Sequence, residues 1–327
     1  MLQMQPDYSK LQFDNKGNLR HFLSLKGIGA ELLNQLLEDA EKYLTLPGSM
    51  SVRSKSLAGR TIGNLFFEPS TRTRASFDLA GRRLGADVLN LDVNTSSRKK
   101  GESILDTIYT LQAMHVDIMV IRDASDGVPA YIARHVDDHI SVLNAGESDI
   151  SHPTQGLLDL MTIRQHNSDF KNMVVAIVGD IQHSRVAMSA AEALQTMGIG
   201  ELRLISPAAL TPKSNRFPGA FLYDNLASGL KDADVVMALR IQRERISNLD
   251  GVPGIDEYYA NYGISNESLR HAKPDAIVMH PGPMNRGIEI EGSVADGPRS
   301  VITKQVTNGV AVRMAVLDRI GKMMNER

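Results

Sequence analysis

The amino-acid sequence predicts an α/β protein of two lobes, each a parallel sheet covered by helices, and three observations support this class. Short, nearly continuous apolar runs rich in β-branched residues recur along the chain, with amphipathic helical stretches between them. Strands of this kind are buried on both faces, which is typical of parallel sheets covered by helices. The chain has 327 residues, which exceeds the size of a single ordinary core.

The apolar runs form one series in each half of the chain. In the first half the predicted strands are residues 61–67, 87–93, 117–122 and 140–144. In the second half they are residues 174–179, 202–205, 235–239 and 276–279. The predicted helices around them are residues 30–44, 71–84, 103–114, 154–166, 185–197 and 310–324. Two such series predict two sheets, and ligands of open α/β sheets bind at the carboxyl ends of the strands.

Composition narrows the classes of function. Hydrophobic residues make up 42% and charged residues 23% of the chain, as in soluble globular proteins. The formal net charge of −2 argues against broad binding to nucleic acid or to anionic membranes. The chain has no cysteine, which excludes disulfides, thiolate metal sites and cysteine nucleophiles. The first residues lack the apolar core of a secretory signal, and no run of about 18 apolar residues predicts a membrane span, so we expect a cytoplasmic protein.

The stretch FFEPSTRTR, residues 66–74, places two arginines and three hydroxyls directly after the first predicted strand. Pro69 ends that strand, so residues 70–74 occupy the first turn of a helix, where backbone N–H groups lack partners and the helix dipole is positive. This chemistry predicts a pocket for a dianion, most simply a phosphate. Arg72 and Arg74 cannot face the same way, so we expect one to bind the ligand. A capped helix with solvated arginines is the alternative, and the lack of GxxxxGK[ST] excludes a P-loop.

Two further polar groups follow predicted strands of the first half. Arg122 ends the strand DIMVIR, at the sheet edge where ligands of α/β proteins bind. His152 and Gln155 lie at the entrance of the predicted helix at residues 154–166, where they can donate to a carbonyl and bind an amide. A lone arginine at a strand end is a weak signal, and a lone histidine at a helix cap is more often structural.

The second half has polar groups of its own at strand ends. The stretch VVAIVGDIQHSR resembles the first turn of a dinucleotide-binding fold, but it has only Gly179 and lacks GxGxxG, which argues against a nucleotide cofactor. Arg185 instead opens the next helix, where it can bind a carboxylate. If the chain stays extended in MALRIQRER, then Arg240, Gln242 and Glu244 lie on one face. The first two would suit a second carboxylate, and a basic helix start on the surface is the alternative.

Two loops complete the pattern. HPGP, residues 280–283, follows the strand DAIVMH, and its prolines make a rigid loop that presents backbone carbonyls to a ligand. Gly282–Pro283 is predicted to be a cis peptide bond. SSRKKGE, residues 96–102, is polar and contains glycine, and taken alone it predicts only a solvated loop.

Taken in order along the chain, these motifs resemble those of the aspartate/ornithine carbamoyltransferase superfamily, and specifically of aspartate carbamoyltransferase catalytic chains. The resemblance extends from Leu19 to the C-terminus and includes FFEPSTRTR, SxxKKGE, HPTQ, the arginine of GDIQHSR, LRIQRER and HPGPMNRG. Each motif is modest, but the ordered set is highly specific. The residues before LRHFLSL depart from many relatives and resemble the branch whose catalytic chains assemble with a dihydroorotase-like partner.

The resemblance implies a domain layout and a set of site residues. It places a carbamoyl-phosphate-binding domain at residues 1–155, an aspartate-binding domain at 156–309, and a C-terminal helix at 310–327 that packs on the first domain. It places the active site between the lobes and at a subunit interface. The implied carbamoyl-phosphate ligands are Ser70, Thr71, Arg72, Thr73, Arg122, His152 and Gln155, with Ser96 and Lys100 from a neighbouring subunit. The implied aspartate ligands are Lys100, Arg185, Arg240 and Gln242, with the carbonyls of Pro281 and Gly282 on the amino groups. The implied catalytic residues are Arg72, Thr73, Lys100, Arg122 and His152.

The implied reaction transfers the carbamoyl group of carbamoyl phosphate to the amine of L-aspartate, an early committed step of de novo pyrimidine (UMP) biosynthesis. The implied unit is a homotrimer with shared sites, alone or in a larger assembly with regulatory or dihydroorotase-like chains, and we expect no metal and no cofactor. One alternative is ornithine carbamoyltransferase, which usually has a cysteine in an HCLP loop, whereas this chain has HPGP and no cysteine. A catalytically silent scaffold subunit is disfavoured because every expected site position carries a competent residue.

Overall fold

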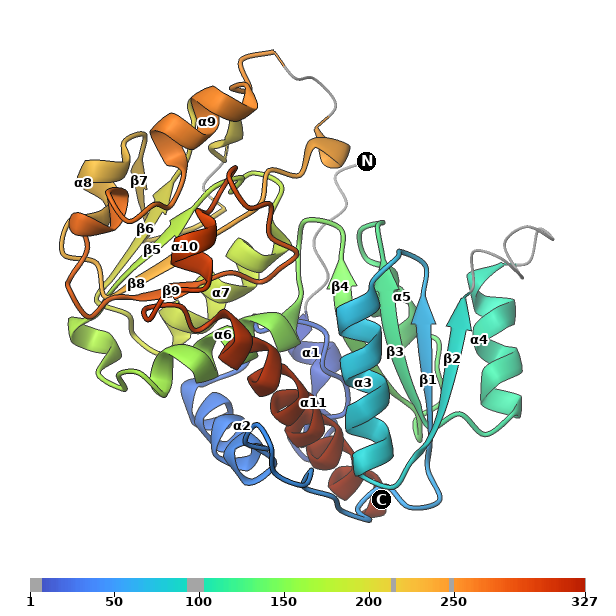
Figure 1. Ribbon diagram of the computed structural model, residues 1–327. Helices are drawn as coiled ribbons and strands as arrows, with labels where there is room; N and C mark the ends of the chain where they lie inside the picture. The colour runs from blue at the N-terminus through green and yellow to red at the C-terminus, as the bar shows by residue number, and fades with distance from the viewer. Residues whose placement is uncertain (1–7, 93–102, 213–215, 247–249, 327) are drawn as a thin grey trace. The chain divides into compact units, whose positions relative to one another are not determined.

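The computed structural model describes residues 8–92, 103–212, 216–246 and 250–326 (Figure 1). The chain divides into two compact units, of which the second holds Asp159–Val306 and the first holds the chain on either side of it. The two divisions fall inside helices α6 (Pro153–Arg164) and α11 (Ile302–Asn325). Each unit has its own sheet and its own core.

The sheet of the first unit contains four parallel strands in the order β2-β1-β3-β4. Its core packs strand residues such as Leu65 and Met119 against helix residues such as Ile108 and Ile132. The strands predicted from the sequence are confirmed to within a few residues at their ends. Their bounds are β1 (Thr61–Phe66), β2 (Asp87–Asp92), β3 (Ile118–Asp123) and β4 (Ser141–Glu147). The helices that belong wholly to this unit are α1 (Tyr8–Gln12), α2 (Ala30–Lys42), α3 (Thr71–Arg83), α4 (Ile104–Ala113) and α5 (Val128–Ala133).

Helix α3 covers strands β1 and β2 and lies in front of the sheet in Figure 1. At Gly81 a side chain would collide with Ile62 of β1, so the glycine lets the helix approach the sheet closely. On the buried face of α3, Phe77 contacts Arg313 of α11, whose guanidinium carbon lies 5.1 Å from the ring centroid. The helix that begins with the STRTR segment is therefore fixed from both sides.

The C-terminal helix α11 begins at Ile302, earlier than the predicted residue 310. Asn308 and Gly309 are weak helix formers, which obscured the first turns in the sequence. In the structure a side chain at position 309 would collide with Arg313 and press on Leu158, so the glycine serves packing inside the helix.

The sheet of the second unit contains five parallel strands in the order β7-β6-β5-β8-β9. The four predicted strands are confirmed, and β7 is an edge strand that the sequence did not reveal because two of its three residues are exposed. The strand bounds are β5 (Val174–Val178), β6 (Glu201–Ile205), β7 (Phe221–Tyr223), β8 (Val235–Ala238) and β9 (Ile277–Met279). The helices are α7 (Arg185–Thr196), α8 (Leu226–Leu230), α9 (Ile255–Tyr262) and α10 (Gly292–Ala295). The 3₁₀ helices are η2 (Phe170–Asn172), η3 (Ala208–Leu210), η4 (Arg243–Arg245) and η5 (Ser268–Arg270).

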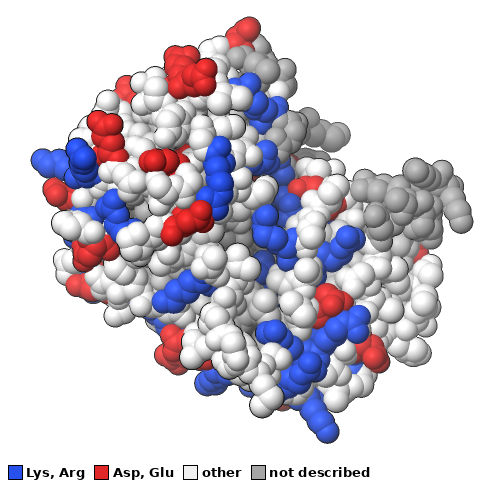
Figure 2. All heavy atoms as spheres, in the orientation of Figure 1, with Lys and Arg blue, Asp and Glu red and all other residues white. Residues whose placement is uncertain are grey.

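The surface carries both signs of charge. On the face drawn in Figure 2, basic and acidic side chains are interspersed with a larger uncharged area. Over the ranges that the structure describes, none of the helices combines the length and apolar character needed to cross a bilayer.

Gly179 joins β5 to the turn that precedes α7. Its φ of +136° is rarely adopted by other residues, and a side chain here would collide with the carbonyl oxygen of Leu239, at the end of the neighbouring strand. Both features require glycine, and together they bring the chain after β5 against the chain after β8.

We expect Gly179→Ala to destabilise the second unit by about 3 kcal/mol, because it adds backbone strain and a collision with fixed backbone. Gly198 is the matched control, since its φ is +74° but the space around it is open. Gly198→Ala should cost only about 1 kcal/mol. Urea denaturation of the two variants measures both losses, and equal losses would show that the close approach of Leu239 is unimportant.

Candidate active site

Three polar segments of the first unit follow parallel strands at the same edge of the sheet. The register pairs Phe66 of β1 with Arg122 of β3, and the amide of Phe67 donates to the Arg122 carbonyl over 2.8 Å. Strand β4 lies beside β3, and the chain after it leads through Ser151 to His152. The ends of β1, β3 and β4 therefore meet at one edge, as parallel pairing requires.

The STRTR segment forms the start of α3, as the sequence predicted. Ser70 is the N-cap residue, with extended backbone and no side-chain capping bond. Thr71 and Arg72 are exposed, whereas Thr73 is only 8% exposed and Arg74 is half-buried. First-turn amides, hydroxyls and an exposed guanidinium at the positive end of a helix are the groups that bind a phosphate.

The Arg122 guanidinium is held by two acceptors. Its Nη2 donates to Oε1 of Glu68 over 2.7 Å, and its Nη1 donates to the carbonyl of Ala145 over 3.3 Å. The side chains of Arg122 and Glu68 are 11% and 18% exposed, so the ion pair is largely shielded from solvent. Because Glu68 belongs to FFEPSTRTR, this charge-assisted bond joins that motif to the end of β3.

His152 and Gln155 form the entrance of α6, and both are buried. The His152 carbonyl accepts from the amide of Gln155 over 2.9 Å, which closes the first turn of the helix. Just before it, Glu147 and Ser151 exchange backbone hydrogen bonds of 2.8 and 3.2 Å. The predicted start of helix α6 is confirmed, and the Glu147–Ser151 backbone bridge fixes the chain just before it.

The buried side chain of Glu147 lies beside this turn. Its carboxyl group accepts from the amide of Gly127 over 2.5 Å and from the side-chain amide of Asn144 over 3.0 Å. Burial raises the pKa of Glu147 to about 7, because desolvation outweighs these hydrogen bonds and the nearby carboxylates Asp126 and Asp123 raise it further. A group that changes charge near neutral pH therefore joins the end of β4 to the amide of Gly127, just before α5.

In the second unit, Arg185 is the first residue of α7 and is only 6% exposed. The N-cap is Ser184, whose hydroxyl accepts from the amide of Ala187 over 3.1 Å. Arg185 opens the helix that follows β5, as the sequence predicted. The helix dipole disfavours a cation at this end unless a negative charge is close, so the position suits a carboxylate-binding role.

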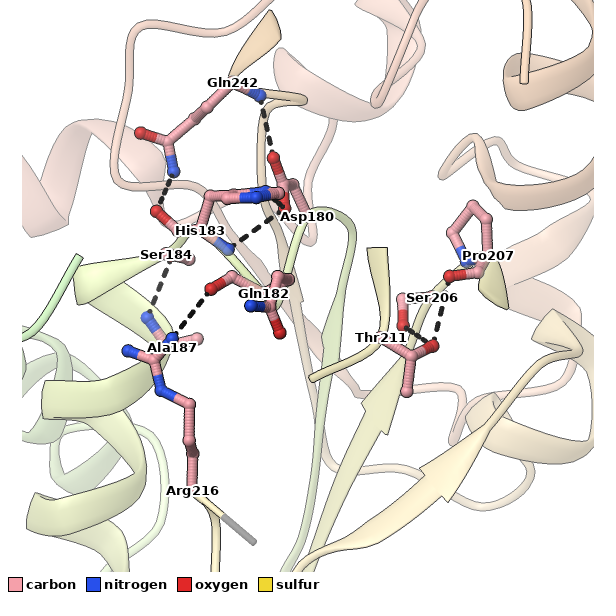
Figure 3. Close-up of polar contacts among 10 residues, drawn as sticks. All are labelled: Asp180, Gln182, His183, Ser184, Ala187, Ser206, Pro207, Thr211, Arg216 and Gln242. Atoms are coloured by element: carbon pink, nitrogen blue, oxygen red, sulfur yellow. Dashed lines mark hydrogen bonds and ion pairs between the residues drawn. The ribbon is translucent and has the colours of Figure 1, made fainter. Parts of the chain in front are cut away.

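Asp180 organises the turn between β5 and α7, and Figure 3 shows it facing His183 and Gln242. Its Oδ1 accepts from the amide of His183 over 3.2 Å and lies 2.8 Å from Nδ1 of the same residue. Its Oδ2 accepts from the amide of Gln242 over 3.1 Å. Because the side chain of Asp180 is fully buried, both oxygens are committed to the protein itself.

Arg240 and Gln242 follow β8, which ends at Ala238. The side chain of Gln242 donates to the carbonyl of His183 over 2.7 Å, and both Arg240 and Gln242 are half-buried. The prediction that the chain stays extended as far as Glu244 is wrong, because the 3₁₀ helix η4 begins directly after Gln242. The tie to Asp180 turns the chain at this point.

The HPGP segment follows β9, and its predicted cis peptide bond between Gly282 and Pro283 is confirmed. His280 is buried, whereas Pro281 and Gly282 are half-exposed. The carbonyls that the family resemblance assigns to substrate amino groups thus belong to a half-exposed loop at the end of a strand.

The predicted site residues are thus placed in two groups. In the first unit, Ser70, Thr71, Arg72, Thr73, Arg122, His152 and Gln155 lie in segments at one sheet edge. In the second unit, Arg185, Arg240, Gln242, Pro281 and Gly282 follow the neighbouring strands β5, β8 and β9. Ser96 and Lys100 lie outside the described residues. Among the residues that are described, no cluster of three or more His, Asp or Glu side chains is arranged to hold a metal ion.

Sequence reasoning missed the carboxylates that hold these groups. Glu68 lies inside FFEPSTRTR, and Asp180 lies two residues after the end of β5. Their position near a strand end was therefore the signal that could have identified both. His183 carried no such signal, because its contact with Asp180 depends on the turn that the chain makes.

Two parallel sheets flanked by helices, with polar and basic groups after the strand ends, define a two-domain α/β protein of the kind that binds ligands at this edge. The family model for the aspartate/ornithine carbamoyltransferase carbamoyl-P binding domain matches residues 20–165, and the one for the Asp/Orn binding domain matches residues 171–320. The chain belongs to the aspartate/ornithine carbamoyltransferase family and is a carbamoyltransferase.

Solved structures of both kinds of carbamoyltransferase are similar to this chain. The catalytic subunit of M. jannaschii aspartate transcarbamoylase is 30% identical, with a TM-score of 0.81, and the match covers 94% of this chain and 100% of that one. Aspartate transcarbamoylase from Trypanosoma cruzi in complex with carbamoyl aspartate and phosphate is 29% identical, with a TM-score of 0.82, covering 98% and 99%. Ornithine carbamoyltransferase from Thermus thermophilus is 25% identical, with a TM-score of 0.78, covering 92% and 98%.

The raised pKa of Glu147 predicts a pH dependence of stability. The folded pKa of about 7 exceeds the ordinary value of 4.5, so the stabilisation is complete below pH 4.5 and is lost as the pH rises through 7. Over that window this group should lower the free energy of unfolding by about 3 kcal/mol. Chemical denaturation between pH 4.5 and 8 measures the slope.

The variant Glu147→Gln cannot titrate, so its slope over this window should be flatter than that of the wild type. Glu38→Gln is the control, because Glu38 is exposed on α2 of the same unit and should leave the slope unchanged. Parallel slopes for wild type and Glu147→Gln would contradict the raised pKa.

Proposed function

We propose that this carbamoyltransferase uses L-aspartate as its acceptor and forms N-carbamoyl-L-aspartate and phosphate, an early committed step of de novo pyrimidine biosynthesis. The observation that carries the proposal is the charge of the acceptor groups in the second unit. Arg185 and Arg240 supply two guanidiniums, and Gln242 adds an amide at the end of β8. Two carboxylates on one substrate match these groups, and guanidinium recognises a carboxylate bidentately.

Asp180 supports the choice of aspartate over ornithine. An ornithine acceptor would require a negative group for its side-chain ammonium, and Asp180 is the carboxylate at this strand end. Both of its oxygens already bind the backbone of His183 and Gln242. The solved aspartate transcarbamoylase from T. cruzi that binds carbamoyl phosphate and aspartate is 28% identical to this chain, which is consistent with the same substrates here.

The phosphate of carbamoyl phosphate is assigned to the start of α3, where Ser70, Thr71, Arg72 and Thr73 offer amides, hydroxyls and a guanidinium. Arg122 is assigned to the phosphate and the carbonyl oxygen, with Thr73 and His152 on that oxygen. Gln155 is assigned to the carbamoyl amide. Each group comes from a segment at the carboxyl edge of the first sheet.

The reaction then follows from positioning and charge. The amine of aspartate attacks the carbamoyl carbon, a tetrahedral oxyanion forms, and the bond to the phosphate oxygen breaks while the amine proton passes to the leaving phosphate. Removing one oxyanion donor typically lowers kcat by about 10²–10³, so Thr73, Arg122 and His152 together account for a large part of the rate. Holding two anionic substrates in line supplies a further large part.

The acceptor is tested by assaying the purified chain with carbamoyl phosphate and either L-aspartate or L-ornithine. We expect carbamoyl-aspartate and no citrulline. Arg240→Ala should lower kcat/KM for aspartate about 10²-fold, because it removes a charge-assisted pair to the side-chain carboxylate. Arg270→Ala is the matched control, since Arg270 is exposed in the same unit and should leave kcat/KM unchanged. Citrulline as the main product would overturn the proposal.

We also propose that the active unit is a trimer in which Ser96 and Lys100 complete the site of a neighbouring chain, as the family resemblance implies. Arg72→Ala and Lys100→Ala chains should each be folded and inactive. When the two are dissociated and reassembled in equal amounts, about a quarter of the sites should combine intact groups and regain activity. Failure of the mixture to regain activity, with trimers present by size measurement, would contradict site sharing.

A further inference from the structure

The loop from His280 to Glu289 is braced from inside by two buried side chains. His280 directly follows β9 and Glu289 lies at the far end of the loop, and the side chain of each is 1% exposed. Nε2 of His280 lies 3.0 Å from Oε1 of Glu289. The same oxygen accepts from the amide of Asn285 over 2.5 Å. One carboxylate oxygen therefore ties the start, the middle and the end of the loop together.

The hydrogen bonds fix the tautomer of the His280 ring. The amide of Gly282 donates to Nδ1 over 2.8 Å, so Nδ1 must carry the lone pair. The ring proton is then on Nε2, which donates to Glu289. Reversing the tautomer would set the proton of Nδ1 against the Gly282 N–H and break both bonds.

Both ends of the braced loop are anchored in the second unit. The amide of His280 donates to the side chain of Gln305 over 2.9 Å, and Gln305 donates to Asp159 over 2.8 Å. At the other end, the amide of Ile264 donates to the carbonyl of Glu289 over 3.0 Å. Because these contacts are largely buried, they fix both ends of the loop that the His280–Glu289 contact holds together.

The contacts of His280 determine which backbone hydrogen-bonding groups of the HPGP segment are available to a ligand. Pro281 and Pro283 have no N–H group, and the N–H of Gly282 is occupied by the ring of His280. The segment therefore presents carbonyl acceptors and no free backbone donor. Such a surface binds the N–H groups of an amine or an amide and repels a carboxylate.

We propose that His280 and Glu289 are positioning residues for the acceptor amine. They do not contact the substrate; they set the carbonyls of Pro281 and Gly282 and keep the Gly282 N–H away from it. This inference rests on the proposed function, because the amine and amide to be bound are those of the two substrates.

The test separates the two halves of the His280 ring by substitution. In His280→Asn the side-chain oxygen takes the place of Nδ1 and can still accept from Gly282. In His280→Gln the side-chain amide takes the place of Nε2 and can still donate to Glu289, but the Gly282 N–H is released. The asparagine variant keeps the contact with Gly282 but loses the contact with Glu289, so we expect it to raise the KM for aspartate less than the glutamine and alanine variants do. The glutamine and alanine variants should raise this KM about tenfold to hundredfold, as small misplacements in an active site do.

Glu289 offers a second, independent pair of variants. Glu289→Gln retains an oxygen that accepts from both His280 and Asn285, so it should behave like the wild type. Glu289→Ala removes the acceptor and should raise the KM for aspartate as His280→Ala does. His271→Ala is the control, because His271 is exposed in the same unit and should change nothing.

Two further measurements distinguish positioning from loss of fold and from failure of the proposed function. The Kd for inorganic phosphate, assigned to the first unit, should be unchanged in every variant. ¹⁵N imidazole spectra of the wild type should show His280 with its proton on Nε2, whichever acceptor the enzyme uses. A proton on Nδ1, or a His280→Asn variant as impaired as His280→Ala, would overturn the inference. Citrulline formation by the wild type would instead overturn the proposed function and leave the spectroscopic test standing.

Discussion

Parallel pairing is the constraint on which the arrangement of both units depends. In a parallel sheet every strand ends at the same edge, so the segments that follow the strands meet there whatever their distance along the chain. In the first unit this pairing brings Phe66 beside Arg122. In the second unit the strands β5, β8 and β9 are neighbours, so the segments that follow them begin at the same edge of the sheet. Parallel pairing therefore places the proposed site residues of each unit at one edge of its sheet.

Carboxylates with little exposure to solvent then decide how the strand-end groups are presented. Glu68 holds the guanidinium of Arg122, Asp180 holds the backbone of His183 and Gln242, and Glu289 holds His280. Hydrogen bonds to such partners offset part of the desolvation cost of a carboxylate and fix the geometry of its neighbours. The carboxylates of Asp180 and Glu289 bind groups of the turns themselves, whereas Arg72 is exposed and Pro281 and Gly282 are half-exposed.

The sequence predicted the features that depend on local pattern. Among the described residues, apolar runs located eight of the nine strands, because a strand buried on both faces must be apolar throughout. The starts of α3, α6 and α7 were predicted because a strand end followed by a capping or polar cluster marks a helix entrance. Strand β7 was missed because Phe221 and Leu222 are exposed and the strand has only three residues.

Contacts that depend on the path of the folded chain could not be predicted from the sequence. The extended chain predicted beyond β8 fails because Asp180, distant in sequence, binds the amide of Gln242 and turns the chain. The early start of α11 was obscured by Gly309, whose purpose is the packing of Arg313 and Leu158. The roles of Glu68, Asp180 and Glu289 likewise depend on partners that only the fold brings close.

The proposed specificity for the acceptor can be explained by the charges and hydrogen-bonding groups at the strand ends of the second unit. Under the proposed function, Arg185 and Arg240 attract carboxylates, whereas the HPGP carbonyls attract N–H groups and would repel a carboxylate placed against them. A substrate with two carboxylates and one amine satisfies both kinds of group. Ornithine would bring a second ammonium toward Arg240, with Asp180 already committed to the backbone, and two like charges in a partly buried site are costly. Specificity for a dicarboxylate would therefore arise as much from the repulsion of a second cation as from the attraction of a second anion.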